Sequence, residues 1–128
     1  MSVDNKTRSE ILEDRLIDFA LDVNKILDKL PRTYLGNNLS SQLTRSSTSP
    51  ALNYGEAQSA SSTKDYIHKM RISLKELRET SVGIKIIERG KLLDDYNFLL
   101  KVKKEASELI AIFISSINSA NSKMNNNN

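Results

Sequence analysis

Apolar side chains recur every three or four residues along most of the chain, and this spacing restricts it to helices more firmly than any other feature. The clearest segment spans residues 9–30. Its apolar positions step by 4, 3, 4, 3 and 4 through Leu12, Leu16, Phe19, Val23, Ile26 and Leu30. Ser9 is a favourable helix N-cap, and Pro31 disfavours helical geometry in the residue before it. The pattern therefore predicts one amphipathic helix over 9–30.

Three further segments show helical spacing. A helix over 33–61 follows a cap at Thr33, and a helix over 64–88 follows a cap at Ser62 or Thr63 and ends before Gly90. A fourth helix begins between residues 92 and 94. No segment alternates like a strand, and the connections are short. The predicted fold is therefore an all-α, antiparallel up-down-up-down four-helix bundle.

The predicted organisation has three parts. Residues 1–8 form a flexible N-terminus, residues 9–118 form the four-helix bundle, and residues 119–128 form a disordered tail rich in asparagine. At 128 residues the chain is one domain, long enough to bury a hydrophobic core.

The second helix is unusual because one of its faces is small and polar. Positions 35, 39, 42, 46, 49, 53, 57 and 60 read Leu, Leu, Gln, Ser, Ser, Asn, Ala and Ala, and Pro50 is expected to kink the helix. Polar groups on a packed face need hydrogen-bond partners. We expect an interface or polar network formed by Arg45, Ser49, Asn53 and Glu56 with Glu76 and Glu79 of the third helix. This face serves either packing within the bundle or contact with a groove, pore or partner subunit.

Charge is distributed unevenly along the chain. The formal net charge is +3, but residues 1–31 carry five Lys/Arg and seven Asp/Glu, whereas residues 64–105 carry eleven and seven. The polar face of the third helix is basic. Its candidate phosphate contacts are Lys64, Lys69, Arg71, Lys75, Arg78 and Lys85. The alternative is an ordinary solvated, charged helix face.

Several functional classes are disfavoured by composition. The chain has no cysteine and a single histidine, His68, so we expect no metal and no cofactor. Glu76 and Glu79 lie three residues apart, but no Glu-x-x-His motif of a di-iron bundle is present, and no serine has an evident base apart from His68. An enzyme is therefore not expected. No apolar run approaches the roughly 20 residues of a membrane span, and no secretory signal is visible, which predicts a cytoplasmic protein.

Two stretches carry a family resemblance. Residues 42–57, QLTRSSTSPALNYGEA, resemble the signature Q-L-x-R-S-A-x-S-I-P-A-N-I-A-E-G of the bacterial S23, or 23S rRNA intervening-sequence, four-helix-bundle proteins. Residues 64–80 resemble the family's third-helix segment, in which an aromatic-rich D-F/Y-x-x-x-L start is followed by S-L-x-E-x-x-E-T. The resemblance covers roughly residues 10–118. The departures are Ser47 for alanine, Pro50 one place early, and Gly55-Glu56-Ala57 in place of A-E-G.

The resemblance implies a bundle that assembles as a homopentamer, with no enzymatic activity. It implies two alternative functions. In the first, the protein binds RNA or DNA through basic surfaces, as an accessory or ribonucleoprotein factor. In the second, it is a structural or protein-interaction bundle that recruits a partner such as a reverse transcriptase, without touching nucleic acid directly.

Overall fold

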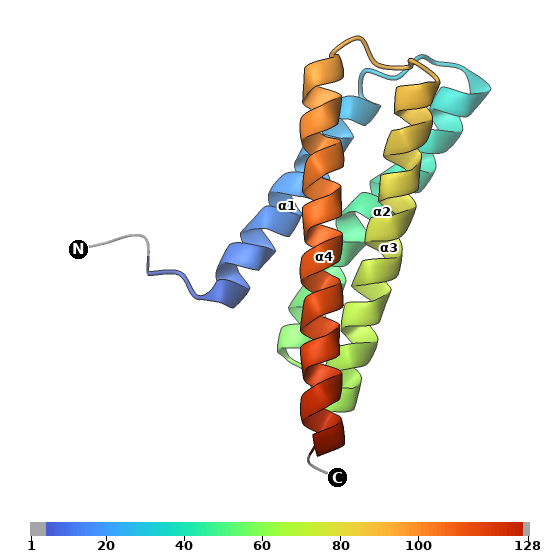
Figure 1. The fold of residues 1–128 in the computed structure, drawn as a ribbon. Coiled ribbons are helices and arrows are strands. Elements are labelled where there is room, and N and C mark those ends of the chain that lie inside the picture. The colour runs from blue at the N-terminus through green and yellow to red at the C-terminus, as the bar shows by residue number, and fades with distance from the viewer. Residues whose placement is uncertain (1–4, 127–128) are drawn as a thin grey trace.

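The computed structural model describes residues 5–126, which form four helices and no strand. The helices are α1 (Arg8–Leu27), α2 (Tyr34–Gln58), α3 (Thr63–Arg89) and α4 (Tyr96–Asn126). Each runs antiparallel to the one before it, and consecutive helices pack side by side (Figure 1). The predicted all-α, up-down-up-down four-helix bundle is confirmed.

The helix N-termini show which capping signals operate. Thr33 caps α2 and Ser62 caps α3, as the sequence predicts. For α1 the expected cap at Ser9 is wrong. Thr7 caps this helix instead, and its side chain and the Glu10 carboxylate each accept the other residue's backbone N–H in a capping box. Ser9 therefore lies within the helix.

The fourth helix differs from its prediction at both ends. It begins at Tyr96, where the Asp95 carboxylate accepts the backbone N–H of Phe98 at 3.1 Å. It continues to Asn126, so the expectation of a disordered tail is wrong for residues 119–126, and residues 127–128 lie outside the described part. Serine and asparagine do not end this helix, because Ala120 and Met124 still pack against the core. The predicted flexible N-terminus also needs correction, since Arg8 is helical; residues 1–4 are not described.

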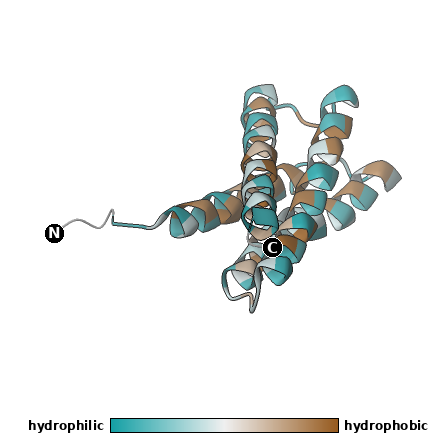
Figure 2. Ribbon diagram, turned by 60° about the horizontal axis from the view of Figure 1, so that its bottom comes forward, coloured by the Kyte–Doolittle hydropathy of each residue, from teal (hydrophilic) through white to brown (hydrophobic). Residues whose placement is uncertain are grey.

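The core lies where the four apolar faces meet, and Figure 2 shows hydrophobic and hydrophilic segments alternating along the helices. Phe19, Met70, Leu77 and Phe113 are almost completely buried. The Tyr54 ring packs edge-on against Phe113, with 5.8 Å between the ring centroids. Burial of these side chains supplies most of the bundle's stability.

The four seams between neighbouring helices are not equally tight. Contacts are extensive between α1 and α2, α2 and α3, and α3 and α4, but sparse between α1 and α4. In both Figure 1 and Figure 2 the N-terminal part of α1 diverges from the other helices. The bundle therefore has three closed seams and one open seam, between α1 and α4.

Candidate nucleic-acid interface

The outward face of α3 carries a row of exposed side chains. Counting outward positions at alternate steps of four and three gives Lys64, His68, Arg71, Lys75, Arg78, Val82, Lys85 and Arg89, all exposed. We call these residues the α3 outer stripe. The opposite face is buried and includes Ile67, Met70, Leu77 and Ile84. Because that face is anchored in the core, the stripe is held on a rigid helix.

The cations of the stripe are unpaired. Within residues 5–126, Lys64, Arg71, Lys75, Arg78, Lys85 and Arg89 form no ion pair with an acidic side chain. At about 1.5 Å per residue, the stripe extends over roughly 37 Å. Its positive charge therefore faces solvent along almost the full length of α3.

Unlike the cations of the stripe, the glutamates of α3 form ion pairs with neighbouring helices. Arg45 of α2 donates to Glu76 at 2.7 Å and to Glu79 at 2.6 Å, across the α2–α3 seam. The hydrogen bond to Glu79, followed by the one to Glu76, raises the pKa of Arg45 above its usual value. The network that the sequence predicts between Arg45 and these two glutamates is present.

The third glutamate of α3, Glu88, pairs with α4 rather than α2. Lys103 of α4 donates to Glu88 at 2.7 Å, and the Tyr96 hydroxyl donates to it at 3.1 Å. The hydrogen bond from Lys103 is the main reason that the pKa of Glu88 lies below its usual value. All three glutamates of α3 are thus neutralised by cations of adjacent helices, which leaves the outer stripe basic.

Lys69 does not belong to the stripe, although the sequence places it among the candidate phosphate contacts. It lies on the flank toward α2, where it donates to Glu56 at 2.7 Å. That hydrogen bond raises the pKa of Lys69. Glu56 is consequently separate from the Arg45 cluster, a separation that heptad positions alone do not show. Arg89, by contrast, extends the stripe beyond the predicted set.

Ser49 and Asn53 form a third, local group. The Asn53 side-chain amide donates to the Ser49 carbonyl at 3.0 Å and to the Ser49 hydroxyl at 2.9 Å, all within α2. The six predicted network residues therefore fall into three separate groups rather than one.

Buried hydroxyls, which the prediction missed, bind α2 to α3. Thr80 Oγ1 lies 2.8 Å from Ser46 Oγ and 2.9 Å from the Glu76 carbonyl oxygen. Ser73 donates to the Pro50 carbonyl at 3.0 Å. All three hydroxyl-bearing side chains are fully buried. The small residues of the polar face were the available signal, but the sequence did not show which partners they meet.

The open seam is bridged chiefly by Arg15 of α1. Its guanidinium donates to Glu105 at 3.0 and 2.6 Å and to Glu108 at 3.2 Å, both on α4. The hydrogen bond to Glu105 is the main reason that the pKa of Arg15 is raised. Here a charged clamp accompanies packing that is sparser than at the other three seams.

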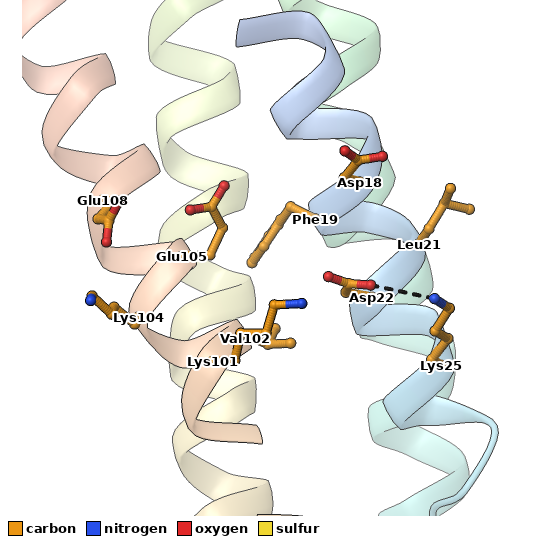
Figure 3. Close-up of a pocket in the computed structure, with 10 residues that line it drawn as sticks. All are labelled: Asp18, Phe19, Leu21, Asp22, Lys25, Lys101, Val102, Lys104, Glu105 and Glu108. Atoms are coloured by element: carbon orange, nitrogen blue, oxygen red, sulfur yellow. Dashed lines mark ion pairs between the residues drawn. The ribbon is translucent and has the colours of Figure 1, made fainter. Parts of the chain in front are cut away.

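Beside this clamp lies a groove of about 570 Å³ (Figure 3). Asp18 and Asp22 line it from α1 and Lys101 from α4, while Lys104 contributes to its α4 edge with its ammonium group pointing away from α1. A second groove, of about 380 Å³, lies nearer the start of α1 and reaches Tyr54 and Tyr66. No residue of the α3 outer stripe lines either groove.

Within the described residues, none of the helices combines the length and the apolar character that a membrane crossing requires.

Comparisons with known proteins agree with this architecture. The chain is similar to a crystal structure of a protein with unknown function from the S23 ribosomal protein family of Bacteroides thetaiotaomicron. The two share 26% sequence identity and a TM-score of 0.73, over 88% of this chain and 99% of the other. The search of curated proteins found no match. The model of the 23S rRNA-intervening sequence protein family matches residues 11–115, and the chain belongs to that family.

Proposed function

We propose that this protein is a non-enzymatic, oligomeric bundle that binds RNA or DNA through the α3 outer stripe, as an accessory or ribonucleoprotein factor. One observation carries the proposal. The glutamates of α3 are paired with Arg45 and Lys103, while six outward cations of the same helix are unpaired within the described residues. A merely solvated helix face would interleave both signs. This face presents one sign.

The chemistry suits phosphate contacts. Lysine and arginine side chains that neutralise phosphates release condensed counterions, and this release supplies most sequence-independent affinity. Self-association would strengthen the effect, because five copies of a chain of charge +3 carry about +15 together. The family's association with 23S rRNA intervening sequences, by name, is consistent with a nucleic-acid partner.

The side chains that an enzyme would need are occupied or isolated. Both carboxylates of the Glu76–Glu79 pair accept hydrogen bonds from Arg45. His68 is exposed on the stripe and has no hydrogen bond to another described side chain, so it activates no serine there. These contacts support a binding function rather than catalysis.

An electrophoretic mobility shift assay tests the proposal. We expect RNA and DNA to be shifted at low salt, with affinity falling steeply as salt rises. The double substitution Lys75→Gln/Arg78→Gln should weaken binding. The matched control Lys101→Gln/Lys104→Gln removes the same charge beside the α1–α4 groove and should leave binding largely unchanged. Absence of any shift at low salt would refute the proposal.

Light scattering tests the oligomer separately. A homopentamer is the expected species, since the family resemblance implies one. A monomer at micromolar concentration would remove the argument from multiplied charge, although each stripe would remain intact.

A second candidate function is recruitment of a protein partner, such as a reverse transcriptase, without direct nucleic-acid binding. The open seam favours it, because the groove lies beside Leu21, whose apolar side chain is 58% exposed. A pull-down of a protein partner that resists high salt, combined with no nucleic-acid shift, would support this alternative.

A further inference from the structure

We infer that the ligand of the α3 outer stripe is a nucleic-acid duplex, contacted through its phosphates alone, rather than a single strand. This inference rests on the proposed function and narrows it to one class of ligand. The shape of the stripe, the chemical groups along it, and the way each kind of nucleic acid gains affinity all favour a duplex.

The stripe is a convex helix face rather than a channel. Its residues are exposed on the outer side of α3, and none lines either groove of the open seam. Proteins that hold single strands usually surround the backbone with a basic groove. A rigid duplex needs no such enclosure, because contact along one side reaches phosphates that are already ordered.

The stripe also lacks the large aromatic rings on which single-stranded bases usually stack. Its eight side chains include no tyrosine, phenylalanine or tryptophan. The exposed tyrosines of the described residues lie elsewhere. Tyr34 is at the start of α2, and Tyr96 is at the start of α4, where its hydroxyl donates a hydrogen bond to Glu88. Stacking on aromatic rings supplies about 1–3 kcal/mol per base to single-strand binding, and the stripe offers only the His68 ring for it.

A surface that contacts only phosphates favours the form with the higher charge density. Duplex DNA releases about 0.9 counterions per contact, compared with about 0.7 for a single strand. Suppose that all six cations contact phosphates and that duplex and single strand bind equally at 1 M salt. The steeper salt dependence of the duplex then makes it bind more tightly by roughly 1.5 decades at about 50 mM salt. We therefore expect a duplex to bind at least about tenfold more tightly than either of its strands.

Fluorescence anisotropy of the full chain tests the inference. The probes are a labelled DNA duplex of about 22 base pairs, an RNA duplex of the same sequence, and the four separate strands. This length is about twice the 11 base pairs that a 37 Å stripe spans. We expect both duplexes to exceed their strands at least about tenfold near 50 mM salt.

The substitutions locate the effect. Lys75→Gln/Arg78→Gln should lower duplex affinity and reduce the slope of log K against log salt by about two. Lys101→Gln/Lys104→Gln should change neither, and circular dichroism would verify that both variants fold. If single strands bind as tightly as duplexes, or more tightly, the duplex inference is wrong while the proposed function stands. If no probe binds, the proposed function itself fails.

Discussion

The α2–α3 seam and the α1–α4 seam join helices of the same bundle in opposite ways. At the first, small residues let the helix backbones approach closely: a Cβ added at Gly83 would lie 2.4 Å from Leu43 Cδ2. At the second, Arg15 and the two glutamates of α4 span a gap with grooves on both sides of the clamp. Close packing fixes the orientation of α3 between its neighbours, whereas α1 packs closely only on α2 and is joined to α4 mainly by one charged clamp. A surface that must present charges in a fixed row is better placed on the tightly packed helix.

The largest expected effect breaks the tight seam. Gly83→Val places a branched side chain against buried Leu43 and should lower the free energy of unfolding by about 2–3 kcal/mol through overpacking. Gly55→Ala is a control for adding a side chain to α2 without a clash, because nothing lies within 4 Å of the added Cβ. It should stabilise α2 by about 0.5–1 kcal/mol. Urea denaturation measures both, and equal effects at the two positions would contradict the picture of close approach.

The next effect concerns the buried hydroxyls of the same seam. Thr80→Val preserves the shape of the side chain but deprives the Ser46 hydroxyl of its partner across the seam. We expect a loss of about 1–2 kcal/mol. The double variant Ser46→Ala/Thr80→Val removes both polar groups and should recover much of that loss. A double-mutant cycle from urea denaturation measures the coupling, which would be close to zero if the two residues acted independently.

Breaking the open seam should have a smaller effect on global stability. Arg15 is about one-third exposed, so Arg15→Gln should lower the free energy of unfolding by only about 0.5–1 kcal/mol. Hydrogen exchange should nevertheless accelerate in α1 more than in α2 or α3, because α1 loses its main tether to α4. Lys104→Gln, which removes no ion pair within the described residues, is the control. Uniform acceleration across all helices would show that the clamp supports the whole bundle.

The smallest effect is a pH dependence at the α3–α4 seam. The pKa of Glu88 is depressed, so its ion pair contributes fully at pH values above the usual carboxyl range, and the contribution is lost as the pH falls from that range through the lower pKa of the folded state. Glu88→Gln should therefore lower Tm slightly at neutral pH and make the decline of Tm toward pH 3 shallower. Glu13→Gln, at an exposed glutamate without an ion pair within residues 5–126, should show neither change.

Prediction of the helices succeeded where local chemistry decides. Apolar spacing and capping residues act over only a few positions of the chain. Thr33 and Ser62 begin helices and Gly90 ends one, as expected. The first cap was misplaced because Thr7 and Ser9 are both good caps, and only Thr7 has Glu10 three residues later. The end of α4 was misplaced because the packing of Met124 against distant residues outweighs the low helix propensity of asparagine and serine.

By itself, the sequence determined the fold class and the basic character of the third helix, because periodicity and charge are local properties of the chain. Only the tertiary structure decided which charges remain free. Lys69 and Lys75 are indistinguishable by residue type, yet Lys69 meets Glu56 across the α2–α3 seam while Lys75 faces solvent. The physical reason is that an ion pair depends on the distance between helices and on their rotation, which the packing of the core sets.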